Sequence, residues 1–302
     1  MSGPVPEGQA ARLAGHAAGM VTTARIVFAD GGCWEMGSRT HVLGILNVTP
    51  DSFSDGGLFL DEGRAADHAA RMACEGADGV DIGGESSRPG AERVSPEEES
   101  RRLLPVLRRV RRENPRLRIS VDTTRARIAS EALDEGADMI NDISAFAADP
   151  EMAAVVAPAR AACVLMHMRG EPRTMQVNPL YGDLMGEIST ELAAAIQRAL
   201  AAGVREEAIA IDPGIGFGKS ARHNLQILRR LTELSKLRRP IMVGASRKSF
   251  IGALTGAEVG ERLEGSLGAS AAAVTAGASL LRVHDVGATV RMLRVVDAIV
   301  RA

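Results

Sequence analysis

The sequence predicts a single (β/α)8 barrel, since short apolar runs alternate with helix-like stretches eight times along the chain. The runs are rich in Val and Ile and lack strict alternation, which is typical of parallel strands buried on both faces. The length of 302 residues fits a barrel of about 250 residues with an extension. Each run ends in polar or charged residues, and barrel enzymes keep their active sites at the strand carboxyl ends. The competing fold is a doubly wound open sheet.

A β-hairpin is expected before the first run. Residues 24–37 alternate, break at Asp30-Gly31-Gly32 and resume, so this hairpin could close the bottom of the barrel. The eight expected strands then end, in chain order, at Asn47, at Asp81 and Glu85, at Asp122, at Asn141, at His167, at Asp212, at Ser246 and Lys248, and at Arg282 and His284.

Glycines mark the expected turns from helix to strand. The tetrapeptide Glu-Gly-Ala-Asp occurs around Gly76 and again around Gly136, and a looser copy surrounds Gly277. Glycine at such a place adopts positive φ and caps the end of a helix. These glycines are therefore predicted to be structural.

Composition and charge indicate a soluble globular protein. The formal net charge is −2 and 25% of the residues are charged, and this balance does not indicate a nucleic-acid-binding surface. The densest basic stretch, residues 101–118, carries apolar residues at helical spacing and predicts a solvated helix face. The charge-free segment 265–281 is too short and too rich in Gly, Ala and Ser for a membrane span, and a packed barrel helix is expected there.

Residues 24–302 are expected to form one barrel domain, and residues 1–23 a disordered tail. The first 20 residues lack the apolar core of a signal peptide, which favours a cytoplasmic protein. The cysteines Cys33, Cys74 and Cys163 have neither disulfide nor zinc spacing, and buried thiols are expected.

Two nucleotide-binding motifs are excluded in residues 212–220. A phosphate loop would need glycine where Pro213 stands, and the glycines are spaced GxGxG instead of GxGxxG. We expect only a flexible loop after Asp212.

Lysine is rare, because only Lys219, Lys236 and Lys248 occur among 36 basic residues. A compact ammonium can donate to a carbonyl or a ring nitrogen in ways that a planar guanidinium does not. Lys248, just beyond a strand end, is predicted to be functional. Lys219 is either functional or placed by chance on a solvated loop, and Lys236 is incidental.

Taken together, the strand ends predict a cup with two different walls. Asp122, Asn141 and Asp212 can bind a flat heterocycle, because a carboxylate pairs with a guanidine-like edge through two parallel hydrogen bonds. The amide oxygen of Asn47 is a suitable ligand for Mg²⁺ bridging phosphates. The bland alternative is that single residues cap helices or are ordinary rim groups. The candidate anion site on the second wall comprises Asn47, Ser86, Arg88, Arg282 and His284.

Five motifs in this order resemble the dihydropteroate synthase family, and the resemblance covers about residue 25 to the C-terminus. The motifs begin with a long loop that runs from Asn47 to Gly57 and a second that runs from Gly83 to Gly90. The remaining motifs are residues 212–219, residues 246–249 and Arg282-Val283-His284.

The resemblance implies condensation of 6-hydroxymethyl-7,8-dihydropterin pyrophosphate with p-aminobenzoate, giving dihydropteroate and pyrophosphate in folate synthesis. It also implies Mg²⁺ as cofactor, inhibition by sulfonamides and a homodimer built through barrel helices. The implied pterin-binding residues are Asp122, Asn141, Met166, Asp212, Phe217 and Lys248. The implied pyrophosphate-binding residues are Asn47, Ser86, Arg88, Arg282 and His284, with Asn47 on the metal. The implied aminobenzoate pocket comprises Phe53, Ser87, Pro89, Ser246 and Lys248.

The charges suggest a dissociative substitution. The aromatic amine is neutral near pH 7, so the barrier lies in breaking the C–O bond, and Mg²⁺, Arg282 and His284 would take up the charge on the leaving group. The implied catalytic residues are Asn47, Asp122, Asp212, Lys248, Arg282 and His284.

Two other functions remain open. A pterin-dependent methyltransferase would explain the acidic wall but not the anion site. An inactive paralogue would be expected to have eroded loops, and both loop motifs are intact.

Overall fold

The computed structural model describes residues 25–48, 58–85, 94–170 and 174–302. The expected tail at residues 1–23 lies outside this part of the chain. Five predicted site residues also lie outside it: Phe53, Ser86, Ser87, Arg88 and Pro89.

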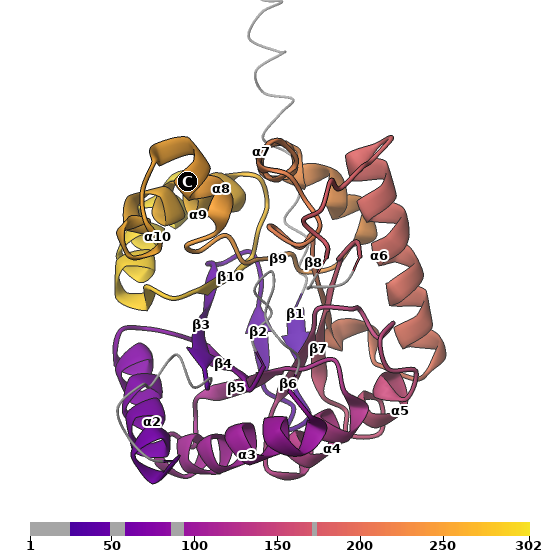
Figure 1. Cartoon of the computed structure of the whole chain (residues 1–302), viewed down its shortest axis with the longest axis vertical. Coiled ribbons are helices and arrows are strands. Elements are labelled where there is room, and N and C mark those ends of the chain that lie inside the picture. The colour runs from indigo at the N-terminus through magenta and orange to yellow at the C-terminus, as the bar shows by residue number, and fades with distance from the viewer. Residues whose placement is uncertain (1–24, 49–57, 86–93, 171–173) are drawn as a thin grey trace, which may run out of the picture.

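The predicted barrel is confirmed. Eight parallel strands follow the order β8-β7-β6-β5-β4-β3-β10-β9 (Figure 1). A parallel bridge between Ile211 in β8 and Ile241, the residue before β9, closes the barrel. The closed ring excludes the doubly wound open sheet. The strands are β3 (His41–Asn47), β4 (Gly79–Gly83), β5 (Arg118–Asp122), β6 (Met139–Asp142), β7 (Ala162–Met166), β8 (Ile209–Asp212), β9 (Met242–Val243) and β10 (Leu280–Val283).

Helices surround the strands and bury their apolar faces against them (Figure 1). The α-helices are α2 (Leu58–Cys74), α3 (Pro96–Glu113), α4 (Ala126–Asp134), α5 (Met152–Val156), α6 (Leu184–Ala201), α7 (Ala221–Arg229), α8 (Ser249–Thr255), α9 (Leu263–Thr275) and α10 (Val286–Val300). Short 3-10 turns are η3 (Glu206–Ala208), η4 (Leu231–Leu237) and η5 (Val259–Glu261).

The basic stretch predicted as a solvated helix face belongs mainly to α3. Ser95 caps this helix, because its hydroxyl accepts the backbone N–H of Glu98. Leu103 and Leu107 are buried on one face, while Arg101 pairs with Glu98 on the other at 2.7 Å. Most of the charge-free segment likewise belongs to α9, packed against the barrel as expected, and its last two residues begin β10.

Glycine ends the helices where the sequence predicted it. Gly76, Gly136 and Gly277 have φ of 102°, 94° and 103°, and each stands between a helix and the next strand. A residue with a Cβ would be strained in this left-handed conformation.

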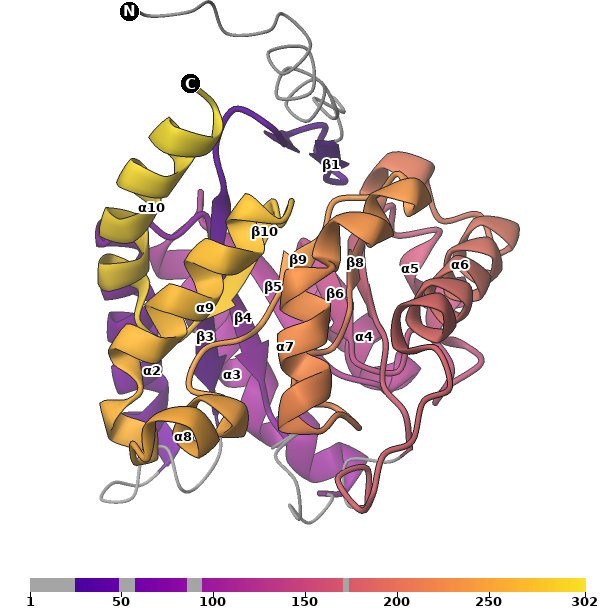
Figure 2. The same ribbon diagram turned by 90° about the horizontal axis from the view of Figure 1, so that it is seen from above.

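The expected hairpin is formed by β1 (Arg25–Val27) and β2 (Cys33–Glu35), which pair antiparallel. It lies at one end of the barrel (Figure 2), and its side chains pack against Leu43, Met139 and Leu280 near the strand starts. Trp34 is the largest of these side chains and stacks on the imidazole of His41. The hairpin therefore plugs the end opposite to the predicted site.

The prediction of three buried thiols is wrong for two of them. Cys163 lies inside β7 and is buried, but Cys33 on the hairpin and Cys74 at the end of α2 are exposed. No helix in the described part of the chain is long and apolar enough to cross a membrane.

Candidate active site

A buried ion network forms the floor of the site. Arg282, on β10, donates through Nε to Asp81 Oδ2 at 2.5 Å and through Nη2 to Asp122 Oδ2 at 2.8 Å. Asp81 points into the barrel from β4 and is 0% exposed. One guanidinium on β10 thus joins β4 and β5, whose carboxylates lie 201 and 160 residues earlier in the sequence.

Burial and neighbouring charges oppose one another in this network. Burial raises the pKa of Asp122, Arg282 lowers it and Asp81 raises it. The net result is a pKa above the ordinary value of an aspartate. Burial lowers the pKa of Arg282, but Asp81 and Asp122 outweigh that effect and raise it above its ordinary value. Arg282 is therefore a permanent cation beside two carboxylates.

Asn141 joins the same floor from β6. Its amide nitrogen donates to Asp81 Oδ2 at 3.0 Å, while its buried Oδ1 has no hydrogen-bond partner among the described residues. A buried amide oxygen without a partner is costly unless a ligand or water satisfies it. Asn141 therefore retains an acceptor for a bound molecule.

Asp212, at the end of β8, is buried on the next wall. Its Oδ1 accepts the backbone N–H of Gly214 at 2.6 Å. Burial raises its pKa to about 6, although that hydrogen bond and the charges of Lys248, Lys219 and Arg282 lower it. The carboxylate is charged near neutral pH and able to bind a cationic or N–H-rich edge.

The loop after Asp212 is not the flexible loop that was expected. Residues 213–219 are all buried, and Gly214, Gly216 and Gly218 have positive φ. A Cβ at Gly214 would lie 1.9 Å from the carbonyl oxygen of His167, which no side chain can tolerate. The glycines thus permit a tight, packed turn.

An apolar surface lies beside the carboxylates. Phe217 packs with Met166, Ile143 and Met175, and the ammonium of Lys248 lies 4.0 Å from the Phe217 ring centroid. Aromatic and thioether groups next to a buried carboxylate suit a flat heterocycle.

Beyond the ends of β9 and β10, next to β8, Ser246 and His284 are bonded to each other. The Ser246 hydroxyl accepts the backbone N–H of His284 at 3.2 Å and lies 3.0 Å from the ring Nδ1. This pairing favours donation from the hydroxyl to Nδ1, which leaves the Nε2 proton available. Burial and the charge of Arg282 lower the pKa of His284 to about 3. His284 is a neutral hydrogen-bond donor and brings no positive charge.

Asn47 ends β3 beside Asp122. A Cβ at Gly83 would lie 3.8 Å from Asn47 Oδ1 and 3.6 Å from Asp122 Cβ, so both side chains border the same strand end. The described residues contain no cluster of three His, Cys, Asp or Glu that could hold a metal. A single amide oxygen fits Mg²⁺, which keeps several waters and takes its other ligands from phosphates.

Sequence reasoning gave Asp81 and His167 no role in the site and left Lys219 open between function and a solvated loop. Lys219 is 2% exposed, which excludes the solvated loop. Its Nζ contacts Nδ1 of His167 at 2.9 Å, so its ammonium meets a ring nitrogen of the protein itself. The rarity of lysine was the available signal for Lys219, whereas nothing in the sequence pairs Asp81 with Arg282.

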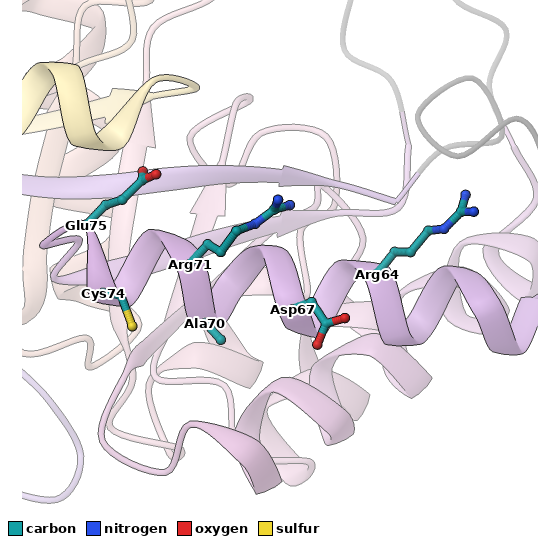
Figure 3. A pocket seen from close by; sticks show the side chains of 6 residues that line it. All are labelled: Arg64, Asp67, Ala70, Arg71, Cys74 and Glu75. Carbon is teal, nitrogen blue, oxygen red and sulfur yellow. The ribbon is translucent and has the colours of Figure 1, made fainter.

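A separate hollow lies on the outer surface along α2 (Figure 3). Its lining belongs to one helix and the residue after it, so it shares no side chain with the predicted site. The lining residues are Arg64, Asp67, Ala70, Arg71, Cys74 and Glu75.

Comparison with known proteins bears on this geometry. Residues 43–284 match a family described as "Pterin binding enzyme". The dihydropteroate synthase of Synechocystis sp. is 48% identical over 269 residues, which cover 89% of this chain and 93% of that protein. The chain belongs to the dihydropteroate synthase family.

Two solved members of the dihydropteroate synthase family share the whole fold. The enzyme from Yersinia pestis, in a complex with a sulfonamide drug, has a TM-score of 0.86 and 41% identity, covering 92% of this chain and 100% of that one. The enzyme from Xanthomonas albilineans, in complex with 7,8-dihydropteroate, has a TM-score of 0.81 and 42% identity, covering 91% of this chain and 98% of that one. The resemblance seen in the sequence motifs is confirmed.

Proposed function

We propose that the chain is a transferase that condenses 6-hydroxymethyl-7,8-dihydropterin pyrophosphate with p-aminobenzoate, giving 7,8-dihydropteroate and pyrophosphate in folate synthesis. The observation that carries this proposal is the set of buried polar groups at the strand ends of the barrel. Asp212 and Asn141 are buried at the ends of β8 and β6, and Arg282 and His284 lie on and just beyond β10. Family membership supports the same reaction.

The acidic wall would hold the pterin. Asp212 would accept two N–H groups from its guanidine-like edge, and Asn141 would offer its unsatisfied oxygen. Phe217 and Met166 would lie against the ring, and Lys248 would donate to a ring acceptor. Asp122 would complete this wall through its ion pair with Arg282.

The neighbouring ends of β10 and β3 would hold the pyrophosphate. Arg282 would supply positive charge, and neutral His284 would donate an Nε2 proton, while Ser86 and Arg88 are assigned here by the resemblance alone. Asn47 would hold Mg²⁺, which when bound supplies charge neutralisation for phosphate oxygens. The protein's own donors thus favour departure of the pyrophosphate.

The chemistry needs little help from a general base. The amine of p-aminobenzoate is neutral near pH 7, so stabilising the leaving group matters most, and a dissociative substitution follows. The electron-rich pterin, anchored by Asp212, would share positive charge at its exocyclic carbon. The aminobenzoate pocket would include Ser246 and the Lys248 stem, together with Phe53, Ser87 and Pro89, and sulfonamides would compete there.

A single assay tests the proposal. Purified protein is mixed with the dihydropterin pyrophosphate, p-aminobenzoate and Mg²⁺, and dihydropteroate is followed with and without a sulfonamide. We expect turnover that needs both substrates and falls with the drug. Pterin binding without turnover would instead support the inactive paralogue, and methyl transfer from a methylated pterin would support the methyltransferase.

A homodimer is part of the proposal. An apolar groove runs between α7, α8 and α9, and the large side chains Leu225 and Leu254 are exposed along it. Exposed apolar surface of this kind is typical of protein interfaces. Leu254→Arg should shift the sedimentation coefficient to that of a monomer. Leu180→Arg, at an exposed leucine away from the groove, should not.

A cytoplasmic location is proposed from the folate activity.

A further inference from the structure

Lys219 is a buried lysine that contacts no substrate in the proposed reaction. It is 2% exposed, and its Nζ donates to the carbonyl of Phe217 at 2.9 Å and to the carbonyl of His167 at 3.3 Å. A third contact, at 2.9 Å, reaches Nδ1 of His167. All three donors of the ammonium are thus used within the protein.

These contacts fix the imidazole of His167. The ammonium can only donate, so Nδ1 must accept and the ring proton must sit on Nε2. Nε2 lies 3.1 Å from a carboxylate oxygen of Glu191, a residue that reaches the surface from α6, but no hydrogen bond joins the two groups. Burial and the charge of Lys219 lower the pKa of His167 to about 3, in agreement with a neutral ring.

Lys219 lies directly behind the turn that holds Asp212. A Cβ at Gly214 would lie 3.3 Å from Lys219 Nζ, and the N–H of Gly214 donates to Asp212 Oδ1 at 2.6 Å. The backbone N–H of His167 also donates to the carbonyl of Asp212 at 2.9 Å. Lys219 therefore ties together the ends of β7 and β8 and the loop that carries Phe217.

The charge of Lys219 also faces Asp212. No carboxylate among the described residues lies within ion-pair distance of its Nζ, so its cation is held by neutral acceptors. Burial lowers the pKa of Lys219 to about 7, and Asp212 raises it; in return Lys219 lowers the pKa of Asp212. A buried cation is costly, and an apolar residue of similar size often stabilises a fold as well or better. A structural role alone does not account for a lysine here.

We infer that Lys219 is a positioning residue of the pterin subsite. From behind the 213–218 loop it holds Asp212 and Phe217 in place and keeps the Asp212 carboxylate charged. This inference rests on the proposed function, because it assigns Asp212 and Phe217 to the pterin. It names no contact between Lys219 and the substrate.

Several charged groups surround the pair and must be considered in any pH profile. Those that act on Asp212 are Lys248, Lys219 and Arg282. Those that act on Lys219 include Asp212, Glu191, Arg169 and Lys248, and its titratable neighbours His167 and His223 are influenced by it in turn.

The test replaces Lys219 by Met, which keeps the length of the stem and removes the charge and the donors. Lys236→Met makes the same change at an exposed lysine in η4 and serves as the matched control. For Lys219→Met we expect the KM for the dihydropterin pyrophosphate to rise about tenfold. A change of this size has the same free energy as a shift of about one unit in the pKa of Asp212. The KM for p-aminobenzoate should change less than about twofold.

The pH profile separates positioning from general loss of structure. Without Lys219 the pKa of Asp212 rises further, so the acid limb of kcat/KM for the pterin substrate should move to higher pH in Lys219→Met. Lys219→Gln keeps two donors but no charge. It should recover part of the KM and none of the shift in the acid limb. It also serves if the Met variant does not fold.

The outcomes discriminate clearly. An unchanged acid limb and unchanged pterin KM in a folded Lys219→Met protein would overturn the inference, as would equal losses for both substrates that follow the melting temperature. Absence of turnover in the unaltered protein would defeat the proposed function instead. In that event, calorimetry with 6-hydroxymethylpterin compares the same variants, and equal affinities would refute the role of Lys219.

Discussion

The side chains available for chemistry here are charged groups held where water is scarce. Asp81, Asp212 and Lys219 are each at most 3% exposed. Electrostatic interactions are stronger in such surroundings than in water, and each unpaired charge is more costly. The buried charges therefore lower the stability of the fold but preorganise the site, which is expected of a protein that must stabilise a departing anion.

The first prediction concerns Asp212. In Asp212→Asn the amide keeps the shape of the side chain but loses the charge that binds the guanidine-like edge. We expect pterin affinity to fall about 30-fold, since hydrogen bonds to a charged group contribute about 2 kcal/mol. The melting temperature should change little, because the substitution removes a buried charge. Calorimetric titration with a pterin and thermal unfolding measure the two effects.

Asp134→Asn is the control, since Asp134 is exposed at the end of α4. A large fall in melting temperature with normal kinetics in Asp212→Asn would show that Asp212 only caps the following turn.

The second prediction concerns pH. The pKa of Asp212 is raised from 3.8 to about 6, so the carboxyl is charged above that pH and neutral below it. Pterin binding should therefore weaken as pH falls from 7 to 5. The same shift has the opposite sign for folding. A raised carboxyl pKa means that the folded state binds the proton more tightly, so this contribution to stability is present below pH 3.8 and is lost as pH rises through about 6.

Calorimetry of pterin binding between pH 5 and pH 8 checks this expectation. Asp212→Asn should flatten the acid side of the profile. An affinity that stays constant down to pH 5 in the unaltered protein would contradict it.

At the residue scale, the sequence predicted which residues end the strands better than it predicted which side chains pair with one another. Asn47, Asp122 and Asp212 were found because each ends an apolar run. Asp81 was noted at a run's end, yet it lies within β4 and its partner Arg282 is two hundred residues away, so no local pattern could reveal the pair. The position of Lys219 was left open, because a glycine-rich loop reads as mobile unless the close contacts that require glycine are known.

Among the structural elements, one charged cluster joins α3, α4 and the segment that precedes α3. The guanidinium of Arg125 pairs with Glu99, which is 1% exposed, and lies 3.1 Å from Glu85 Oε2. Its Nη2 also donates to the carbonyl of Val94 at 2.7 Å, and Thr123 donates to Glu99 at 2.7 Å. Arg125 thus anchors the two described residues, Glu85 and Val94, on either side of the 86–93 segment.

The third prediction follows from this cluster. Arg125→Met leaves the carboxylate of Glu99 buried with only the hydroxyl of Thr123 as partner. We expect a loss of about 3 kcal/mol in the free energy of unfolding, as when one partner of a buried ion pair is removed. Urea denaturation measures it. Arg127→Met is the matched control, since Arg127 on α4 forms exposed ion pairs with Glu97 of α3 and Glu131 of α4, and this variant should lose less than about 1 kcal/mol.

Equal losses in the two arginine variants would show that Glu99 is not held by Arg125. A result of that kind would also remove the argument that this cluster fixes the ends of the 86–93 segment.

The order of elements was predictable from the sequence, and their extent was not. Apolar runs and glycine turns gave eight strands and the helices between them, because periodicity reports burial directly. The run before Ser246 was expected to be a full strand, but β9 contains two residues. Likewise, exposure of Cys33 and Cys74 depends on which face of an element each occupies, which their spacing does not reveal.

In the whole molecule, stability and chemistry are placed at opposite ends of the barrel. The hairpin plug packs at the strand starts, whereas Asp122 and Asp212 lie at the strand ends. Barrels of this class commonly divide their two ends in this way.

The fourth prediction tests that division. Trp34 is buried between Phe28 and His41, so Trp34→Ala should cost about 3–5 kcal/mol in the free energy of unfolding through the cavity it leaves. At a temperature where the variant is fully folded, both KM values should stay within about twofold of the original, because the plug touches no site residue. Circular dichroism and steady-state kinetics give the two readings. A kinetic defect in the folded variant would show that the two ends are coupled.

The ring of strands is thinnest between β8 and β9, where one bridge from Ile211 to Ile241 completes it. Backbone amides should exchange with solvent sooner beside this seam than in the middle strands, since few hydrogen bonds must open there. Asp212 stands on one side of the seam and Lys248 follows the other. A pterin bound by both residues would connect the two sides of this seam. Bound substrate would therefore stabilise the junction of the barrel that has the fewest hydrogen bonds between strands.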